Sequence, residues 1–141
     1  MKTTAIILLG LVTAISGCAT DYSIKTGAPT ARLNLSTSQF KTVCAEGKLF
    51  NLRTDANNIA LVEAGKRITV RGGFYNYVYG GVSTSCTASS SFVPKENGEY
   101  FLDFQVESEH CSSIIYQVTN KGPTGLAWES SLQPSRECRA K

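Results

Sequence analysis

The cysteines are the residues of this chain with the clearest capacity for chemistry. Four of them are spread over the part of the sequence that can fold: Cys44, Cys86, Cys111 and Cys138. No two are spaced as Cys-x-x-Cys, and the chain has one histidine, so we expect no zinc site and no other metal. If the chain is exported to an oxidising compartment, an even number of cysteines predicts two disulfides and no cysteine nucleophile.

The first 18 residues predict export and attachment to a membrane. Lys2 precedes an apolar segment over residues 5–15, which is shorter than the ~20 residues that span a bilayer. Residues 15–18, Ile-Ser-Gly-Cys, then resemble the lipobox of bacterial lipoprotein signal peptides. This resemblance implies cleavage after residue 17 and acylation of Cys18. The alternative is an ordinary signal peptide with a nearby cleavage site and a cysteine present by chance.

The same resemblance implies a location for the mature chain. Ala19, rather than an aspartate, follows Cys18, and by the sorting rules of enteric bacteria this implies the outer membrane, at its periplasmic face or on the cell surface. Residues 18–29 are polar and aperiodic, which predicts a lipidated flexible tether with a reach of at most roughly 35–40 Å. We therefore expect a signal peptide over 1–17, the tether over 18–29 and one domain over 30–141.

Composition sets limits on the partners. Cleavage after residue 17 of the 141 leaves 124 residues, enough for a single domain. The formal net charge of the whole chain is +3, and the charges are scattered. Because there is no polybasic stripe, we expect no nucleic-acid partner.

Alternation of apolar and polar residues predicts an all-β fold. The clearest case is Tyr100–Val106, and similar patterns occupy residues 31–36, 67–71, 114–118 and 126–132. Turn residues separate these segments, and none shows a helical repeat. The spacing predicts an antiparallel two-sheet β-sandwich of about seven or eight strands. In this interpretation Ile114, Tyr116 and Val118 face inward, and Trp128 belongs to the core.

Asn97-Gly98 provides the strongest local turn signal, because a type I′ turn needs two residues with positive φ. The turn would pair residues 92–94 with Tyr100–Val106 in one hairpin. In that register Cys86 and Cys111 lie two residues out of alignment, a gap that a longer loop or a bulge at Pro94 would close. We therefore expect the disulfide Cys86–Cys111, which leaves Cys44 to pair with Cys138.

Residues that could catalyse a reaction lack suitable partners. His110 would have to serve any serine triad, but it adjoins a bridged cysteine, and no Gly-x-Ser-x-Gly sequence accompanies it. Glu107 and Glu109 share a strand face with Asp103 and Gln105, which is typical of a solvated face. Residues 55–58 lack the glycine and glutamate of a calcium loop. We expect no enzyme, no catalytic residue and no cofactor.

One segment is a candidate binding surface. Tyr75, Tyr77 and Tyr79 would project from one side of a strand between two Gly-Gly pairs, with Arg71 nearby. Tyrosines offer both an aromatic face and a hydroxyl group, which suits a protein contact or a sugar ring. The alternative is that one or two of these side chains are ordinary core or cross-strand aromatics.

Two short segments suggest a family likeness. Residues 63–70 and 91–100 resemble the strand and turn sequences of prealbumin-like or carboxypeptidase-regulatory-like sandwiches, which implies an Ig-like fold and no catalytic residues. The chain thus resembles small bacterial lipoproteins with a β-sandwich domain. This resemblance implies a non-catalytic interaction or accessory module of the cell envelope, with a protein or glycan partner. Two alternatives stay open. A glycan- or peptidoglycan-binding module requires an exposed tyrosine strand, and an inhibitor or immunity protein requires a protruding loop.

Overall fold

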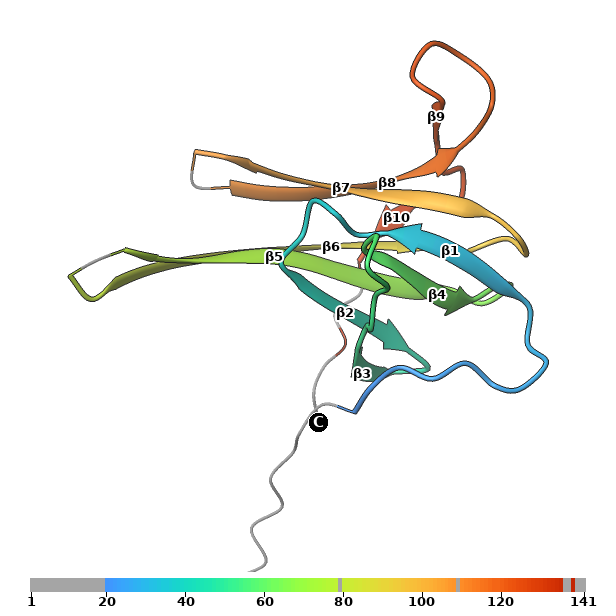
Figure 1. The fold of residues 1–141 in the computed structure, drawn as a ribbon, viewed down its shortest axis with the longest axis horizontal. Helices are drawn as coiled ribbons and strands as arrows, with labels where there is room; N and C mark the ends of the chain where they lie inside the picture. Colours follow the sequence, from blue (N-terminus) through green and yellow to red (C-terminus); the bar gives the residue numbers. More distant parts are fainter. Residues whose placement is uncertain (1–19, 79, 109, 136–137, 139–141) are drawn as a thin grey trace, which may run out of the picture.

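Two packed β-sheets form the domain (Figure 1). The computed structural model describes residues 20–78, 80–108, 110–135 and 138. In this part of the chain there are strands but no helices, and so no helix that could cross a membrane. The strands are β1 (Thr30–Asn34), β2 (Phe40–Ala45), β3 (Lys48–Asn51), β4 (Ile59–Glu63), β5 (Ile68–Val78), β6 (Val82–Phe92), β7 (Glu99–Glu107), β8 (His110–Val118), β9 (Leu126–Trp128) and β10 (Gln133–Pro134).

The strand order confirms the predicted β-sandwich. Sheet I has the order β4-β1-β7-β8-β9, and sheet II has the order β10-β6-β5-β2-β3. Every pairing between these strands is antiparallel except that of β1 with β7, which is parallel. The prediction of seven or eight strands is low because β2, β4 and β10 lie outside the segments whose alternation predicted a strand, and β10 has only two residues.

The core lies between the two sheets, where strand alternation turns apolar side chains inward. On β7 the predicted inward residues Tyr100, Leu102 and Phe104 are buried, as expected. The Tyr100 ring meets the Phe92 ring of sheet II edge-on, with 5.0 Å between the ring centroids. Val106, predicted to follow the same pattern, is 47% exposed because the end of β7 extends beyond the packed body.

The predicted facing of β8 is wrong by one residue. Ile115 is the fully buried residue of this strand, and it lies opposite the buried Leu102 of β7. Ile114, Tyr116 and Val118 therefore point outward. Trp128 lies opposite Tyr116, so it also points outward and is 66% exposed instead of belonging to the core. The cause is that β8 carries apolar residues on both faces, so that its alternation does not determine which face is buried.

The predicted hairpin at Asn97-Gly98 is also wrong. The turn exists, since Asn97 has a φ of 57° and the Gly98 N–H donates to the Lys95 carbonyl over 2.9 Å. However, it connects β6 of sheet II to β7 of sheet I instead of joining two paired strands. β6 pairs with β5 along its full length, and β7 pairs with β8.

Both expected disulfides are present. Cys86–Cys111 has a Cα–Cα distance of 6.0 Å and Cys44–Cys138 one of 5.6 Å. Because β6 and β8 belong to different sheets, the first bridge joins the two sheets, not two neighbouring strands as the hairpin argument assumed. The second bridge holds the C-terminal segment to β2.

The beginning of the described chain packs against the domain. Asp21 forms a parallel bridge with Asn51, and the Tyr22 N–H donates to the Asn51 carbonyl over 2.8 Å. The Tyr22 ring contacts Phe50, with 5.8 Å between centroids, and Asp21 forms an ion pair with Arg53 at 2.6 Å. This part of the segment that we expected to be a flexible tether is therefore held against β3 and the residues that follow it. Residues 1–17 and Cys18 lie outside the described residues.

Candidate functional site

Two hairpins extend past the rest of the sandwich in the same direction (Figure 1). β5 pairs with β2 only as far as Gly73, so its residues 74–78 continue with β6 alone beside them. We call residues 74–88 of the β5–β6 hairpin the arm. Residues 104–113 of the β7–β8 hairpin lie next to it, and the Cys86–Cys111 disulfide joins the two hairpins. This disulfide therefore restrains the arm relative to the β7–β8 hairpin beside it.

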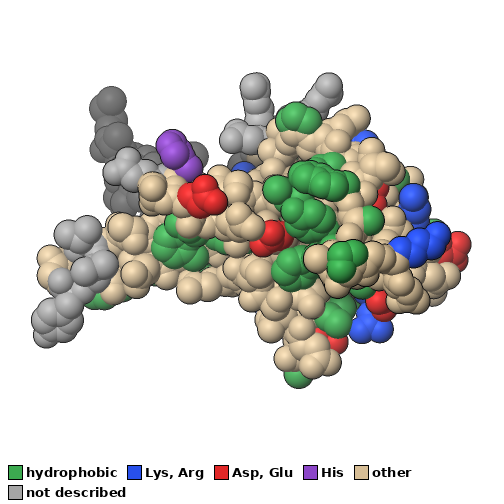
Figure 2. Space-filling view, turned by 90° about the horizontal axis from the view of Figure 1, so that it is seen from above, with side chains coloured by type: hydrophobic (Ala, Val, Ile, Leu, Met, Phe, Trp, Pro, Cys, Tyr) green, Lys and Arg blue, Asp and Glu red, His purple; other side chains and the backbone are tan. Residues whose placement is uncertain are grey.

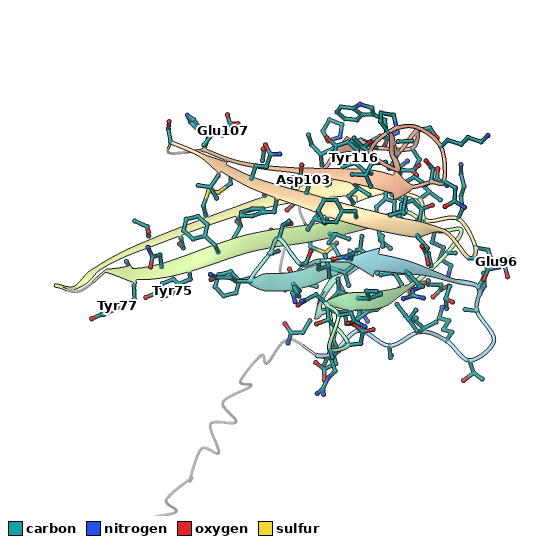
Figure 3. The ribbon with its side chains drawn as sticks, turned by 45° about the horizontal axis from the view of Figure 1, so that its top comes forward. Tyr75, Tyr77, Glu96, Asp103, Glu107 and Tyr116 are labelled. Atoms are coloured by element: carbon teal, nitrogen blue, oxygen red, sulfur yellow. A yellow bond between two sulfur atoms is a disulfide. The ribbon has the colours of Figure 1, made fainter. Side chains whose placement is uncertain are left out.

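The arm presents the two described tyrosines of the candidate surface to solvent (Figure 3). Tyr75 is 44% exposed and Tyr77 is 65% exposed, and both point away from the β7–β8 hairpin. Tyr79 lies outside the described residues. Arg71 lies on the same face of β5 but nearer the body, where it is half-buried and its Nε donates to the Ser89 hydroxyl over 3.4 Å. The structure thus groups Tyr75 with Tyr77, while Arg71 lies at the base of the arm.

Hydroxyl side chains complete this face, a feature that the sequence analysis missed. Tyr75 lies opposite Ser85, and Tyr77 lies opposite Ser83. Every second residue of β6 on this outer side is a serine or threonine: Ser83, Ser85, Thr87, Ser89 and Ser91. We call these residues the hydroxyl row. The signal was visible in the sequence as alternate Ser/Thr residues within a segment, 72–94, that contains no charged residue.

Two glycines let the arm leave the body. A Cβ added at Gly73 would lie 2.8 Å from the Cys86 carbonyl oxygen, and one added at Gly72 would lie 3.0 Å from Leu102 Cδ2. The Gly73 N–H donates to the buried Ser38 hydroxyl over 2.8 Å. Gly72 and Gly73 therefore serve close packing. The second glycine pair makes the turn at the tip, where Gly80 and Gly81 have φ values of 112° and 88°.

A cleft of about 390 Å³ opens between the two projecting hairpins. The residues that line it are Phe74, Ser83, Thr84, Ser85, Cys86, Val106 and Ser108, of which Ser83 and Ser85 carry their side chains on the opposite, outer face of β6. Among the residues that the structure describes, this lining has no titratable side chain, because Cys86 is bridged. The described lining of the cleft therefore suits uncharged groups.

A second exposed surface covers the outer face of sheet I. Phe101, Tyr116 and Trp128 lie opposite one another on β7, β8 and β9, and we call them the aromatic row. The Tyr116 and Trp128 rings are 5.5 Å apart with 58° between their planes. Figure 2 shows a hydrophobic patch over this sheet. Beside it Asp103 lies opposite Ile114 and accepts a hydrogen bond from Gln105 Nε2 over 2.7 Å.

Groups suited to catalysis or metal binding do not converge in the described structure. His110 lies at the start of β8, opposite Glu107, at the far end of the β7–β8 hairpin. No group of three or more His, Cys, Asp or Glu residues in the described ranges could hold a metal ion. The arm and the aromatic row are two exposed surfaces of the described domain. No protein-family model matches the chain, and no curated protein or solved structure matches it either.

Proposed function

We propose that this chain is a lipoprotein of the bacterial outer membrane whose domain is a non-catalytic interaction module. The lipobox resemblance of residues 15–18 supports the anchor, and the two disulfides agree with an oxidising periplasm or cell surface. Acyl groups on one residue give stable anchoring when more than one chain is attached, as in this class of lipoprotein.

The observation that carries the interaction role is the exposure of Tyr75 and Tyr77 beside the hydroxyl row. Tyrosine supplies a large, rigid contact area, and serine supplies adaptable hydrogen bonding. These two residue types dominate the binding surfaces of antibodies. An uncharged, projecting arm with this composition suits contact with a folded envelope protein. The same projection is what the alternative of an inhibitor or immunity protein requires, since an arm can enter the cleft of an enzyme.

Truncating both tyrosines tests the arm. We expect Tyr75→Ala with Tyr77→Ala to weaken partner binding at least tenfold and to leave the melting temperature within about 2 °C, because both side chains are solvated. The measurement is affinity capture from envelope extract, followed by titration of the captured protein. Leu61→Ala, at a 54% exposed site on β4, is the matched control. A double variant that unfolds, or that binds as tightly as the wild type, would contradict the proposal.

The anchor has its own test. We expect Cys18→Ser to leave the signal peptide uncleaved or to release the protein from the membrane fraction. Intact-mass spectrometry of the detergent-extracted wild type should show the mass of the acyl groups on a chain that begins at Cys18. An unmodified Cys18 would exclude this kind of anchor and leave the arm proposal untouched.

The aromatic row favours a second function, glycan binding. Exposed aromatic rings stack on the apolar faces of sugar rings, and Asp103 and Gln105 could hydrogen-bond the hydroxyl groups. Here we expect Trp128→Ala to abolish co-sedimentation with purified peptidoglycan, with Leu61→Ala again as the control. Retention of binding in the Trp128 variant would exclude the aromatic row as the glycan site.

A further inference from the structure

One edge of the arm is open. β5 pairs with β6 along Val82–Phe92, whereas β10 pairs with the other edge of β6 only at Ser90 and Ser91. In the described part of the chain, residues 82–89 therefore have no neighbouring strand on that edge. Their main-chain donors and acceptors on that side are available for pairing.

The hydrogen-bond pattern identifies the residues that present these groups. On β5, Gly73 and Tyr75 turn their main-chain groups away from β6: the Gly73 carbonyl accepts from the Gln39 N–H over 2.9 Å, and the Tyr75 N–H donates to Gln39 Oε1 over 3.0 Å. Successive residues of a strand alternate in this direction, so the even-numbered residues of β5 bond to the even-numbered residues opposite them on β6. Ser83, Ser85 and Thr87 consequently direct their N–H and C=O groups to the open edge. The position of Pro134 opposite Ser90 fits this pattern, because no N–H is needed there.

This edge lacks the devices that normally prevent strand pairing. Natural edge strands are short, or carry charged residues or proline. The outermost strands of both sheets obey this rule, since β3 includes Lys48, β4 ends at Glu63, β10 includes Pro134 and β9 has three residues. On the opposite edge of the arm, the Gln39 side chain caps Tyr75. β6, in contrast, has eleven residues with neither charge nor proline.

We propose that the open edge of β6 pairs with the same edge of a second copy of this chain, antiparallel about a twofold axis. Such an interface needs a surface that complements itself. A hydroxyl group both donates and accepts a hydrogen bond, so the hydroxyl row complements its own copy, whereas a charged row would repel it. The pairing joins two copies of sheet II into one continuous sheet, with Tyr75 and Tyr77 of each copy on the same face.

The position of β10 limits the register. An axis at Thr84 places Ser83 opposite Ser85 of the second copy. It also places Gly80 of the second copy opposite Ala88, so the turn at the tip ends before β10 begins to pair at Ser90. Centring the axis nearer the body would drive that turn into Pro134.

Proline and alanine at one position separate main-chain pairing from side-chain contact. Ser85→Pro removes an N–H that faces the open edge, whereas Ser85→Ala keeps it. We expect the wild type and Ser85→Ala to form dimers in sedimentation equilibrium of the full chain in density-matched detergent. For Ser85→Pro we expect the dimer dissociation constant to rise by about tenfold or more, with an unchanged melting temperature. A wild type that is monomeric at every concentration, or a proline variant that dimerises as well as the wild type, would overturn the proposal.

Charge pairs test the register and remain decisive if the proline variant does not fold. Ser83→Lys with Ser85→Lys places like charges opposite each other across the axis, and should give monomers. Ser83→Lys with Ser85→Glu places opposite charges there, and should restore dimers. Equal association of the two double variants would refute this pairing. These experiments measure self-association alone. A failure of the dimer proposal is therefore distinguishable from a failure of the proposed contact between Tyr75, Tyr77 and a different envelope protein. A complex with another protein and no dimer would assign the edge to that partner instead.

Discussion

Single residues set the fit between the sheets, and Tyr100 is the clearest example. Its ring packs on Phe92, and its hydroxyl accepts the Lys95 N–H over 2.9 Å, inside the turn that connects the sheets. A Cβ added at Gly98 would lie 2.7 Å from Tyr100 Cε2. This glycine is therefore needed to make room for the ring, in addition to any role in the turn. Burial raises the pKa of the Tyr100 hydroxyl, although the hydrogen bond from Lys95 acts in the opposite direction.

The raised pKa of Tyr100 predicts a loss of stability at alkaline pH. A group whose pKa is higher in the folded state stabilises the fold below its unfolded pKa, about 10 for tyrosine, and this stabilisation is lost as pH rises through the folded pKa. We expect the free energy of unfolding in urea to fall as the pH rises above about 10. Tyr100→Phe should flatten this decline while costing about 1 kcal/mol at pH 7, through the lost hydrogen bond. An equal decline in both proteins would assign the effect to other groups.

At the scale of elements, the exit of the arm depends on backbone packed closely against backbone. Gly73 meets the Cys86 carbonyl oxygen, which cannot move without disturbing the β5–β6 pairing. Gly47, in the turn between β2 and β3, has a φ of 76° and open space around its Cα. The two glycines are therefore required for different reasons, one for space and the other for conformation.

Alanine substitutions separate these two requirements. We expect Gly73→Ala to cost about 2–3 kcal/mol, because the strands must separate to admit the methyl group. Gly47→Ala should cost about 1 kcal/mol, the strain of a left-handed backbone at a non-glycine residue. Urea unfolding measures both values. A larger cost at Gly47 than at Gly73 would contradict the packing argument.

The elements also show what the sequence could and could not predict. The all-β class and most of the strands follow from local alternation, and the presence of two disulfides follows from the number of cysteines. The pairing of Cys86 with Cys111 was predicted from a hairpin that does not form, and alternation alone left open whether Tyr75 and Tyr77 are exposed. The assignment of β6 and β7 to different sheets does not follow from local patterns, because Asn97 specifies a chain reversal but not which strand is paired after it. The facing of β8 is similarly undetermined, since Ile114 and Ile115 are equally apolar and only the register with Leu102 decides between them. The aromatic row was missed for this reason.

Over the whole molecule, the two disulfides act on different scales. Cys44 and Cys138 are 94 residues apart, and their bridge restrains almost the entire domain, whereas Cys86 and Cys111 are 25 residues apart. By loop-closure entropy the long bridge stabilises the fold by about 4.7 kcal/mol and the short one by about 3.5 kcal/mol. The short bridge lies where the two hairpins extend past the body, so its effect is concentrated there.

Removing each bridge separately checks this division. We expect Cys44→Ala with Cys138→Ala to lower the global free energy of unfolding by about 1 kcal/mol more than Cys86→Ala with Cys111→Ala does. The second pair should instead accelerate amide hydrogen exchange in residues 74–88 and 104–113, with little change in β1 and β4. Uniform exchange throughout the domain in both variants would show that the arm is not a separate unit.

The contact of Asp21 and Tyr22 with the β3 region has a consequence for how a partner is encountered. With an anchor at Cys18, the two residue steps that separate the anchor from Thr20, whose carbonyl accepts the Asn51 N–H, can span at most about 7 Å, in place of the 35–40 Å of an unbound tether. The shorter linker holds the domain closer to the bilayer, so the arm explores a smaller volume than it would on a free tether. Effective concentration rises as the accessible volume shrinks, so components held in that volume meet the arm far more often than freely diffusing ones. An affinity too low to hold a freely diffusing partner on the arm can thus be high enough to maintain a complex between two proteins of the same membrane.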